Sequence, residues 1–192
     1  MKAALVALVA VGLLGQQAAA SDVPREGAVT VREVSAGVYS VSATFEVSES
    51  PQIAWEVLTD YASLPRFLPD IRVSVVRERS GGRVLLEQEA VSKFLMFSKR
   101  IQLLLDVQEE SGVIVFRDTG ARSFTRYQGS WRFVPVEGRT QLQYELTAQP
   151  AFSVPQFLIG RVLGRDAKEM IDRLRAEIAQ RALRAPSGAH GE

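Results

Sequence analysis

Hydrophobic and polar positions alternate along most of the chain. In the stretch VYSVSATFEV, Tyr39, Val41 and Phe45 share one side while the serines, the threonine and the glutamate occupy the other, which is the period of a half-buried β-strand. The alternation returns after residue 70 in six further runs, separated by short Gly- and Ser-containing turns. Short connections between alternating strands predict hairpins, so we expect an antiparallel meander preceded by a shorter strand over residues 28–34.

Two segments replace this alternation with helical spacing. A short helix is expected to begin at Ser50 and Pro51, because serine can cap a helix and proline's missing N–H is harmless in the first turn. A long helix is expected from residue 154 to about residue 183, where apolar residues recur at steps of three and four. This stripe consists of Leu163, Ala167, Met170, Ile171, Leu174, Ile178 and Ala182. The pattern therefore predicts an α+β fold.

The segment DYASLPRFLPD, after the first helix, is interrupted twice by proline. Leu64 precedes Pro65 and Leu68 precedes Pro69, and a residue before proline is disfavoured in the helical region. At most one helical turn is therefore expected between the two prolines, and it carries Phe67. This turn is either a corner that plugs the end of the sheet or a mobile rim over a cavity.

The first residues have the layout of a secretory signal peptide. Lys2 supplies a positive charge, the apolar run that follows ends at Leu14, and small residues at Ala18 and Ala20 form a cleavage site. A transmembrane helix needs about 20 apolar residues, and this run is shorter. We expect cleavage of residues 1–20, a periplasmic or secreted protein, and an N-terminal extension over residues 21–36 that contains the short first strand.

Composition excludes several classes of function. The 23 Lys plus Arg nearly balance the 22 Asp plus Glu, so nothing favours a nucleic acid partner. The chain has no cysteine, and its single histidine, His190, lies in a tail over residues 185–192 that we expect to be disordered. The body of the chain thus offers no thiolate, no histidine-based triad and no usual zinc ligand. We expect a monomer without metal or cofactor.

Two sequence elements stand out within this order of strands and helices. The first has the pattern Tyr-x-x-Leu-Pro-x-Phe-x-Pro and consists of Tyr61, Leu64, Pro65, Phe67 and Pro69. The second is Gly-x-Trp in the penultimate strand, formed by Gly129 and Trp131 and followed by Thr140 and the strand of Tyr144. Over about residues 37 to 183, the chain resembles the START-like polyketide cyclase/dehydrase superfamily (SRPBCC), in particular its coenzyme Q-binding START-domain branch.

What the resemblance implies is a helix-grip fold over residues 37–184. In such a fold, a strongly curved antiparallel sheet wraps the C-terminal helix and leaves an apolar cavity between them. The two short helices would close one end of the sheet near the entrance and would place Phe67 and Leu68 where a ligand passes. Members of the coenzyme Q branch act inside cells at the respiratory membrane, whereas residues 1–20 predict export. Ubiquinone is therefore one candidate ligand among others.

Inward-facing side chains are candidates for the wall of this cavity. Gln88 has apolar residues on both sides of it, so either it points into the cavity or it is a buried polar group that needs partners. Aromatic residues with a polar tip suit the wall of an apolar pocket and also an ordinary core. The candidate ligand-binding residues are Phe67, Leu68, Leu86, Gln88, Leu103, Tyr127, Trp131, Tyr144, Phe157, Met170 and Leu174. A register slip of one residue would invert the assignments on the strands.

Three functions remain open from the sequence. The first is non-catalytic binding or transport of a hydrophobic small molecule, such as a prenyl quinone, an isoprenoid or a fatty acyl lipid, with transient membrane contact as an option. The second is a polyketide cyclase or dehydratase-type enzyme, which is disfavoured because acid–base catalysis normally uses a group that titrates near pH 7. The third is an interaction module whose own side chains fill the pocket.

Overall fold

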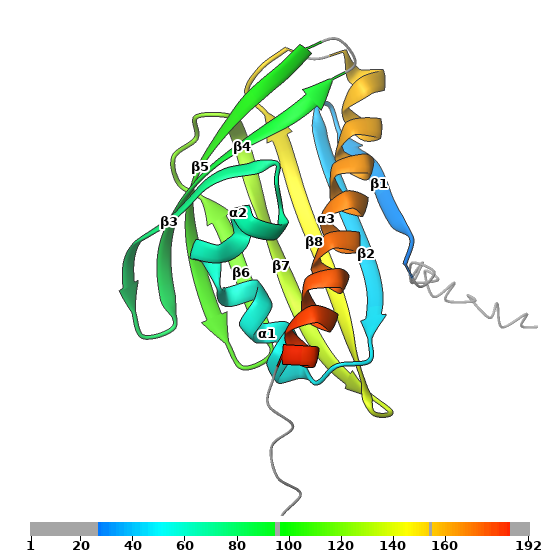
Figure 1. The fold of residues 1–192 in the computed structure, drawn as a ribbon. Helices are drawn as coiled ribbons and strands as arrows, with labels where there is room; N and C mark the ends of the chain where they lie inside the picture. The colour runs from blue at the N-terminus through cyan, green and yellow to red at the C-terminus, as the bar shows by residue number, and fades with distance from the viewer. Residues whose placement is uncertain (1–26, 95–96, 154, 185–192) are drawn as a thin grey trace, which may run out of the picture.

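An eight-stranded antiparallel sheet curves around a long C-terminal helix in the computed structural model, which describes residues 27–94, 97–153 and 155–184 (Figure 1). In chain order the elements are β1 (Val29–Ser35), β2 (Val38–Val47), α1 (Pro51–Thr59), η1 (Tyr61–Ser63), α2 (Leu64–Phe67), β3 (Ile71–Ser80), β4 (Arg83–Phe94), β5 (Phe97–Glu110), β6 (Val113–Asp118), β7 (Phe124–Val136), β8 (Arg139–Pro150) and α3 (Gln156–Arg184). The signal peptide and the tail predicted from the sequence lie outside the described residues.

The strands lie along the sheet in the order β1-β2-β8-β7-β6-β5-β4-β3. Strands β3 to β8 form the predicted meander, in which each strand pairs with the next. Between β2 and β3, the helices α1, η1 and α2 carry the chain to the far edge of the sheet, and β8 returns to pair with β2. Figure 1 shows α3 against the concave side of the sheet. This arrangement confirms the α+β helix-grip fold.

The side chains that face α3 are those that the alternation placed inward. Val41, Ala43 and Phe45 of β2 are buried. Tyr144 of β8 pairs with Ala43 on one side and with Trp131 of β7 on the other, so the three lie in one row across the sheet. The predicted strand register is therefore correct in this central part of the sheet.

Gly129 lets two neighbours approach the backbone of β7 closely. A Cβ atom at this position would lie 2.2 Å from the backbone oxygen of Glu145 and 2.6 Å from the ring of Phe116. Both separations are shorter than any stable van der Waals contact between heavy atoms. The glycine of the Gly-x-Trp element is thus required by packing, two residues before Trp131 on the same face of the strand.

The short helices close one end of the curved sheet. Ser50 caps α1, its Oγ accepting a hydrogen bond from the backbone N–H of Ile53 at 3.5 Å. The hydroxyl of Tyr61 donates to Glu109 of β5 at 2.9 Å, and Arg79 of β3 binds the other oxygen of that carboxylate at 3.0 Å. The tyrosine of the first sequence element therefore attaches η1 to two strands.

One local expectation for this segment is wrong. Leu64 was expected to leave the helical region because it precedes Pro65, yet it has φ −49° and ψ −42° and begins α2. Pro65 lies in the first turn, where its missing N–H leaves no hydrogen bond unmade, and the buried side chain of Leu64 favours this geometry. Leu68, with φ −111° and ψ 82°, does leave the helical region before Pro69 and ends the turn.

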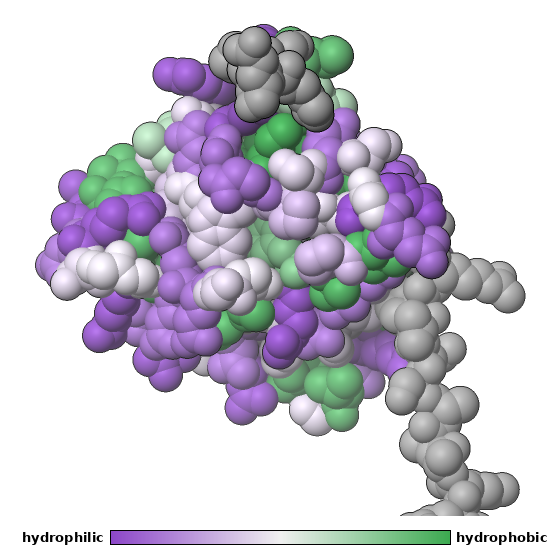
Figure 2. Space-filling view, turned by 90° about the horizontal axis from the view of Figure 1, so that it is seen from below, coloured by the Kyte–Doolittle hydropathy of each residue, from purple (hydrophilic) through white to green (hydrophobic). Residues whose placement is uncertain are grey.

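The C-terminal part of α3 is attached to the same short helices. Arg181 donates to Asp60, between α1 and η1, at 2.9 Å and to Glu177 on its own helix at 2.8 Å. Figure 2 views this end of the molecule, where hydrophilic side chains dominate and hydrophobic areas are small and separate. In the described part of the chain, no helix is both long and apolar enough to cross a bilayer.

Candidate functional site

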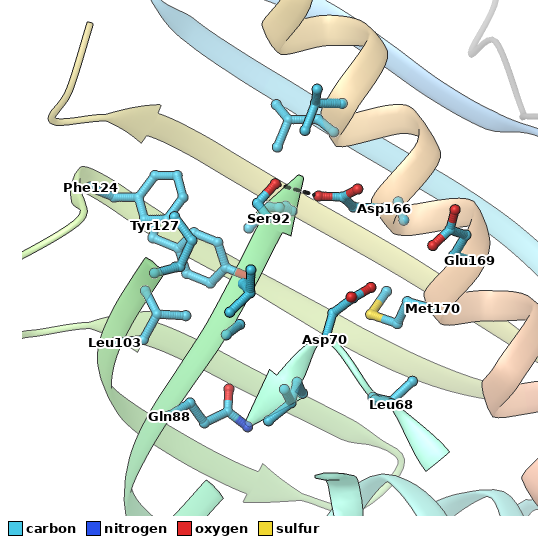
Figure 3. A pocket seen from close by; sticks show the side chains of 18 of the residues that line it. Leu68, Asp70, Gln88, Ser92, Leu103, Phe124, Tyr127, Asp166, Glu169 and Met170 are labelled. Atoms are coloured by element: carbon cyan, nitrogen blue, oxygen red, sulfur yellow. Dashed lines mark hydrogen bonds between the residues drawn. The ribbon is translucent and has the colours of Figure 1, made fainter. Parts of the chain in front are cut away.

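A cavity lies between the sheet and the N-terminal half of α3 (Figure 3). Its outer part, which we call the outer chamber, has a volume of about 220 Å³ and is lined mainly by apolar residues from β3, β4, β5, β7, β8 and α3. The exposed members of this lining are Pro69, Glu169 and Arg173. The chamber therefore meets solvent between the loop before β3 and α3.

A second space, the inner chamber, lies deeper, beneath α1, η1 and α2. Its volume is about 150 Å³. The residues that line it alone are Leu58, Tyr61, Leu64, Leu86, Leu105, Val107, Ile114, Phe116, Trp131 and Leu174. All of its described lining residues are uncharged, so this chamber suits an apolar group.

The two chambers share a wall, which we call the partition. The residues that line both chambers are Leu68, Ile71, Gln88, Tyr127, Tyr144 and Met170. Three of these six carry uncharged polar tips. Beyond them, the described lining of the inner chamber is apolar except for the hydroxyl of Tyr61, which is bonded to Glu109, and the indole N–H of Trp131. A zone of uncharged polar groups thus lies at the middle of the cavity.

A pair of tyrosines forms the polar centre of the partition. Burial raises the pKa of Tyr127 to about 12, helped by the negative charges of Asp118 and Asp166. Burial also raises the pKa of Tyr144 well above its ordinary value. The interaction between the two hydroxyls raises the pKa of Tyr144 and lowers that of Tyr127. Both phenols keep their protons at neutral pH, so either hydroxyl can donate a hydrogen bond.

Gln88 of β4 reaches the partition from the opposite side of the cavity. Its side-chain Nε2 donates to Oγ of Ser74 on β3 at 3.3 Å, a long hydrogen bond. An amide has two protons and a carbonyl oxygen, so the side chain keeps hydrogen-bonding capacity for a further partner. Both sequence-based interpretations of Gln88 therefore hold, because it lines the cavity and also bonds a protein neighbour.

The mouth of the outer chamber carries mainly negative charge. Asp70, Asp166 and Glu169 lie there with Arg173. Asp166 is held from two sides, by the hydroxyl of Ser92 at 2.8 Å (Figure 3) and by Arg165 at 2.6 Å. In the described residues, no group of three or more His, Cys, Asp or Glu side chains is placed to hold a metal ion.

Most of the predicted site residues lie together in the structure. Those lining the outer chamber are Leu68, Gln88, Leu103, Tyr127, Tyr144 and Met170, and those found only in the inner chamber are Leu86, Trp131 and Leu174. Their contact with a ligand stays a prediction.

Two predicted site residues lie away from both chambers. The ring of Phe67 is partly buried against the core, with the guanidinium of Arg181 5.9 Å from its centroid. Phe157, at the start of α3, is 69% exposed. The geometry of α2 explains why Phe67 lies outside the chambers. Within this single turn, Leu64 and Leu68 take the inward-facing positions, and Phe67 faces α3.

Some lining residues were missed by sequence reasoning. Phe124 is one of them; it forms an aromatic corner of the outer chamber with Phe152, whose segment was expected at the rim, and the two ring centroids lie 6.3 Å apart. The contact between Ser92 and Asp166 joins residues 74 positions apart, and no local pattern could indicate it. Leu163 had a usable signal, since it belongs to the predicted apolar stripe of the last helix and lies seven residues before Met170.

Comparison with known proteins places this geometry in a family. Residues 47–175 match the family described as polyketide cyclase / dehydrase and lipid transport. No curated protein matches the chain significantly.

Solved structures show the same fold at low sequence identity. The aromatase/cyclase ZhuI from a Streptomyces species has a TM-score of 0.66 at 16% identity and covers 79% of this chain and 99% of its own. A START superfamily protein from Mycobacterium smegmatis has a TM-score of 0.61 at 19% identity, covering 73% and 97%. A STAR-related lipid transfer protein fragment from Xanthomonas axonopodis has a TM-score of 0.59 at 13% identity, covering 79% and 99%.

The family match establishes the superfamily, and the solved structures show the shared fold. Neither selects a branch, so the coenzyme Q branch stays a prediction. The family includes both lipid transport and polyketide cyclisation or dehydration, and both processes require a site for a hydrophobic molecule. The match over most of the chain, together with the curved sheet, the long C-terminal helix and the cavity between them, shows that the chain belongs to the START-like polyketide cyclase/dehydrase and lipid-transport family.

Proposed function

We propose that the protein binds and carries a hydrophobic small molecule, such as a prenyl quinone, an isoprenoid or a fatty acyl lipid, in the two chambers. The observation that supports this most strongly is the distribution of chemistry along the cavity. Charged side chains lie at its mouth, neutral polar tips line the partition, and mainly apolar side chains line the inner chamber. Such a site solvates an apolar molecule better than water does.

The energy available is sufficient for a carrier. Burial of apolar surface contributes about 25 cal/mol per Å², so enclosing about 200 Å² of a ligand contributes ~5 kcal/mol. Met170 adds adaptability, since its unbranched side chain can adjust to different apolar shapes. A carrier also has to release its ligand, and the opening beside Pro69 gives a short path from the outer chamber to solvent.

A polyketide cyclase or dehydratase is the second candidate. The observation in its favour is the pair of hydroxyls of Tyr127 and Tyr144 at the partition, which could orient and polarise a carbonyl group. General acid–base catalysis works best with a group whose pKa lies near the operating pH, and burial moves the pKa of Tyr127 to about 12. The pair is therefore better suited to hydrogen bonding than to proton transfer.

Export and transient membrane contact are also part of the proposal. Export rests on residues 1–20 alone. Membrane contact is supported by exposed Phe157 and by the outer chamber's Phe152, over which the ammonium of Lys99 lies at 5.0 Å. An apolar side chain beside basic residues suits the surface of an anionic bilayer.

Native mass spectrometry of the mature protein purified from its own host tests the proposed function. A carrier is expected to show a mass above that of the polypeptide, which disappears on denaturation and matches a hydrophobic compound in the solvent extract. A polypeptide mass alone, together with no saturable binding of any hydrophobic probe, would leave the interaction module as the better account.

A further inference from the structure

We infer that the ligand spans both chambers and carries an uncharged hydrogen-bond acceptor, such as a ketone or quinone-type carbonyl, inside its length rather than at a charged end. We further infer that Met170 determines access to the inner chamber. Both inferences rest on the proposed function. The observation behind them is that the polar tips of Gln88, Tyr127 and Tyr144 lie at the partition, with apolar space on both sides.

The hydrogen-bond donors at the partition favour an acceptor on the ligand. Two phenol hydroxyls and one amide meet there, and even where one phenol donates to the other, one phenol proton stays available for another partner. Neither phenol is charged at neutral pH. A carbonyl oxygen at the partition would accept a phenol proton, and a second polar atom could bond the amide of Gln88.

The charges of the lining disfavour an anionic ligand. A carboxylate bound at the mouth would meet Asp70, Asp166 and Glu169, while Arg173 is exposed and Arg165 is already bonded to Asp166. A carboxylate bound in the inner chamber would have no charged partner among its described lining residues, and burying an unpaired ion is strongly unfavourable. An uncharged ligand meets neither obstacle.

Met170 is the member of the partition best suited to control passage between the chambers. Figure 3 shows its side chain projecting from α3 into the cavity, and it lines both chambers. An unbranched thioether has three rotatable bonds and can move aside without disturbing the backbone. A tyrosine has a rigid ring and only two χ angles, so the phenols are less free to move.

The chain contains a reporter that distinguishes the chambers. Trp131 lines the inner chamber and not the outer one. Trp55, the other tryptophan, lines neither chamber and contacts Phe133, with ring centroids 5.3 Å apart. In a Trp55→Phe background, a change in fluorescence therefore reports entry into the inner chamber, while calorimetry reports binding in either chamber.

Four probes of equal chain length test the class of ligand: a linear ketone with a central carbonyl, the isomer with the carbonyl next to one end, the alkane and the carboxylic acid. The central ketone is expected to bind most tightly and to change Trp131 fluorescence saturably. Tyr127→Phe or Tyr144→Phe should weaken ketone binding about fivefold, as loss of one hydrogen bond does, and should leave alkane binding unchanged. The two single variants together show which hydroxyl binds the ketone, and unchanged ketone binding in both would contradict the inferred ligand class.

Met170→Phe tests the gate in the same background. It should abolish the Trp131 response to the central ketone, while calorimetric binding of a short ketone that fits the outer chamber persists. Leu163→Phe, on the same helix but lining only the outer chamber, is the matched control. It should weaken binding of both ketones, but because the inner chamber stays open, the central ketone should still give the full Trp131 response at saturation. Melting temperatures identify any variant that fails to fold. Met170→Ala then serves as the second test. Its smaller side chain should let the central ketone reach the inner chamber faster, so the change in Trp131 fluorescence should be faster than in the wild type.

The outcomes separate the inference from the proposed function. If no probe binds by calorimetry and nothing co-purifies, the proposed function itself is wrong. If the probes bind but the acid equals the central ketone, or Tyr127→Phe weakens ketone and alkane alike, the inferred ligand class is wrong. If binding leaves Trp131 silent, or both Met170 variants behave as wild type, the assigned role of the partition is wrong.

Discussion

Replacing Phe67 with alanine tests whether this residue stabilises the fold or regulates the entrance to the cavity. The structure places this ring against α3, outside both chambers, with Arg181 over its face. Truncating a fully buried phenylalanine costs about 3 to 5 kcal/mol. Phe67 is only partly buried, which reduces that loss to ~2 kcal/mol, and loss of the cation–π contact adds ~0.5 kcal/mol.

The expected effect of Phe67→Ala is thus a loss of ~2.5 kcal/mol in the free energy of unfolding, or about 5 to 10 °C in melting temperature for a domain of this size. Urea unfolding followed by tryptophan fluorescence measures the first quantity. Stopped-flow displacement of a bound probe measures the ligand off-rate, which we expect to stay within about twofold of wild type. Leu68→Ala is the matched control, because Leu68 lines both chambers and its truncation should raise the off-rate. Unchanged stability with faster exchange in Phe67→Ala would show that Phe67 is a rim residue after all.

Three further predictions follow from contacts within the sheet. Burial raises the pKa values of Tyr127 and Tyr144 above those of the unfolded chain, so their contribution to stability is complete below about pH 10. The contribution of Tyr127 is lost as the pH rises through about 12, and that of Tyr144 is lost as the pH rises through its own raised pKa; a phenolate absorbance titration in which both ionise near pH 10 would contradict this. The hydrogen bond from Arg83 lowers the pKa of Asp106, so the stability that it gives is present above about pH 4 and is lost as the pH falls through the lowered value. Arg83→Ala should therefore move the midpoint of acid unfolding to higher pH, and an unchanged midpoint would refute the coupling. Gly129→Ala should destabilise the protein by about 1 to 3 kcal/mol in urea unfolding, since its Cβ would overlap backbone of β8; a variant as stable as wild type would show that β7 and β8 separate easily.

The order of elements and the inward face of the sheet could be predicted because both depend on local periodicity. A strand that alternates as β2 does has only one face that can be buried, so Val41, Ala43 and Phe45 had to face the core. The same reasoning placed Trp131 and Tyr144 on the inside, where their ring centroids lie 4.5 Å apart. Eight of the nine predicted site residues that line the chambers follow from this periodicity or from the helical stripe of α3, and the ninth, Leu68, came from the proline-interrupted segment.

The remaining features depend on contacts between distant parts of the chain. Phe67 was assigned to the entrance because its motif ends at two prolines, but its direction is set by α3, which supplies Arg181. Phe157 was expected near the cavity, but the first turn of α3 points it to solvent. The division of the cavity depends on the meeting of Gln88, Tyr127 and Met170, which lie on three different elements. Their relative heights along the cavity are set by tertiary packing, which the sequence pattern does not contain.

The central claim is that a hydrophobic ligand occupies the chambers between the sheet and α3. Native mass spectrometry of the wild type beside Ala90→Phe, both purified from the native host, tests this most directly, because Ala90 lines the outer chamber and a larger side chain there occupies the ligand's volume. With both proteins folded by circular dichroism, we predict a bound hydrophobic mass on the wild type and little or none on the variant. The same bound mass on both proteins, or none on either, would contradict the claim.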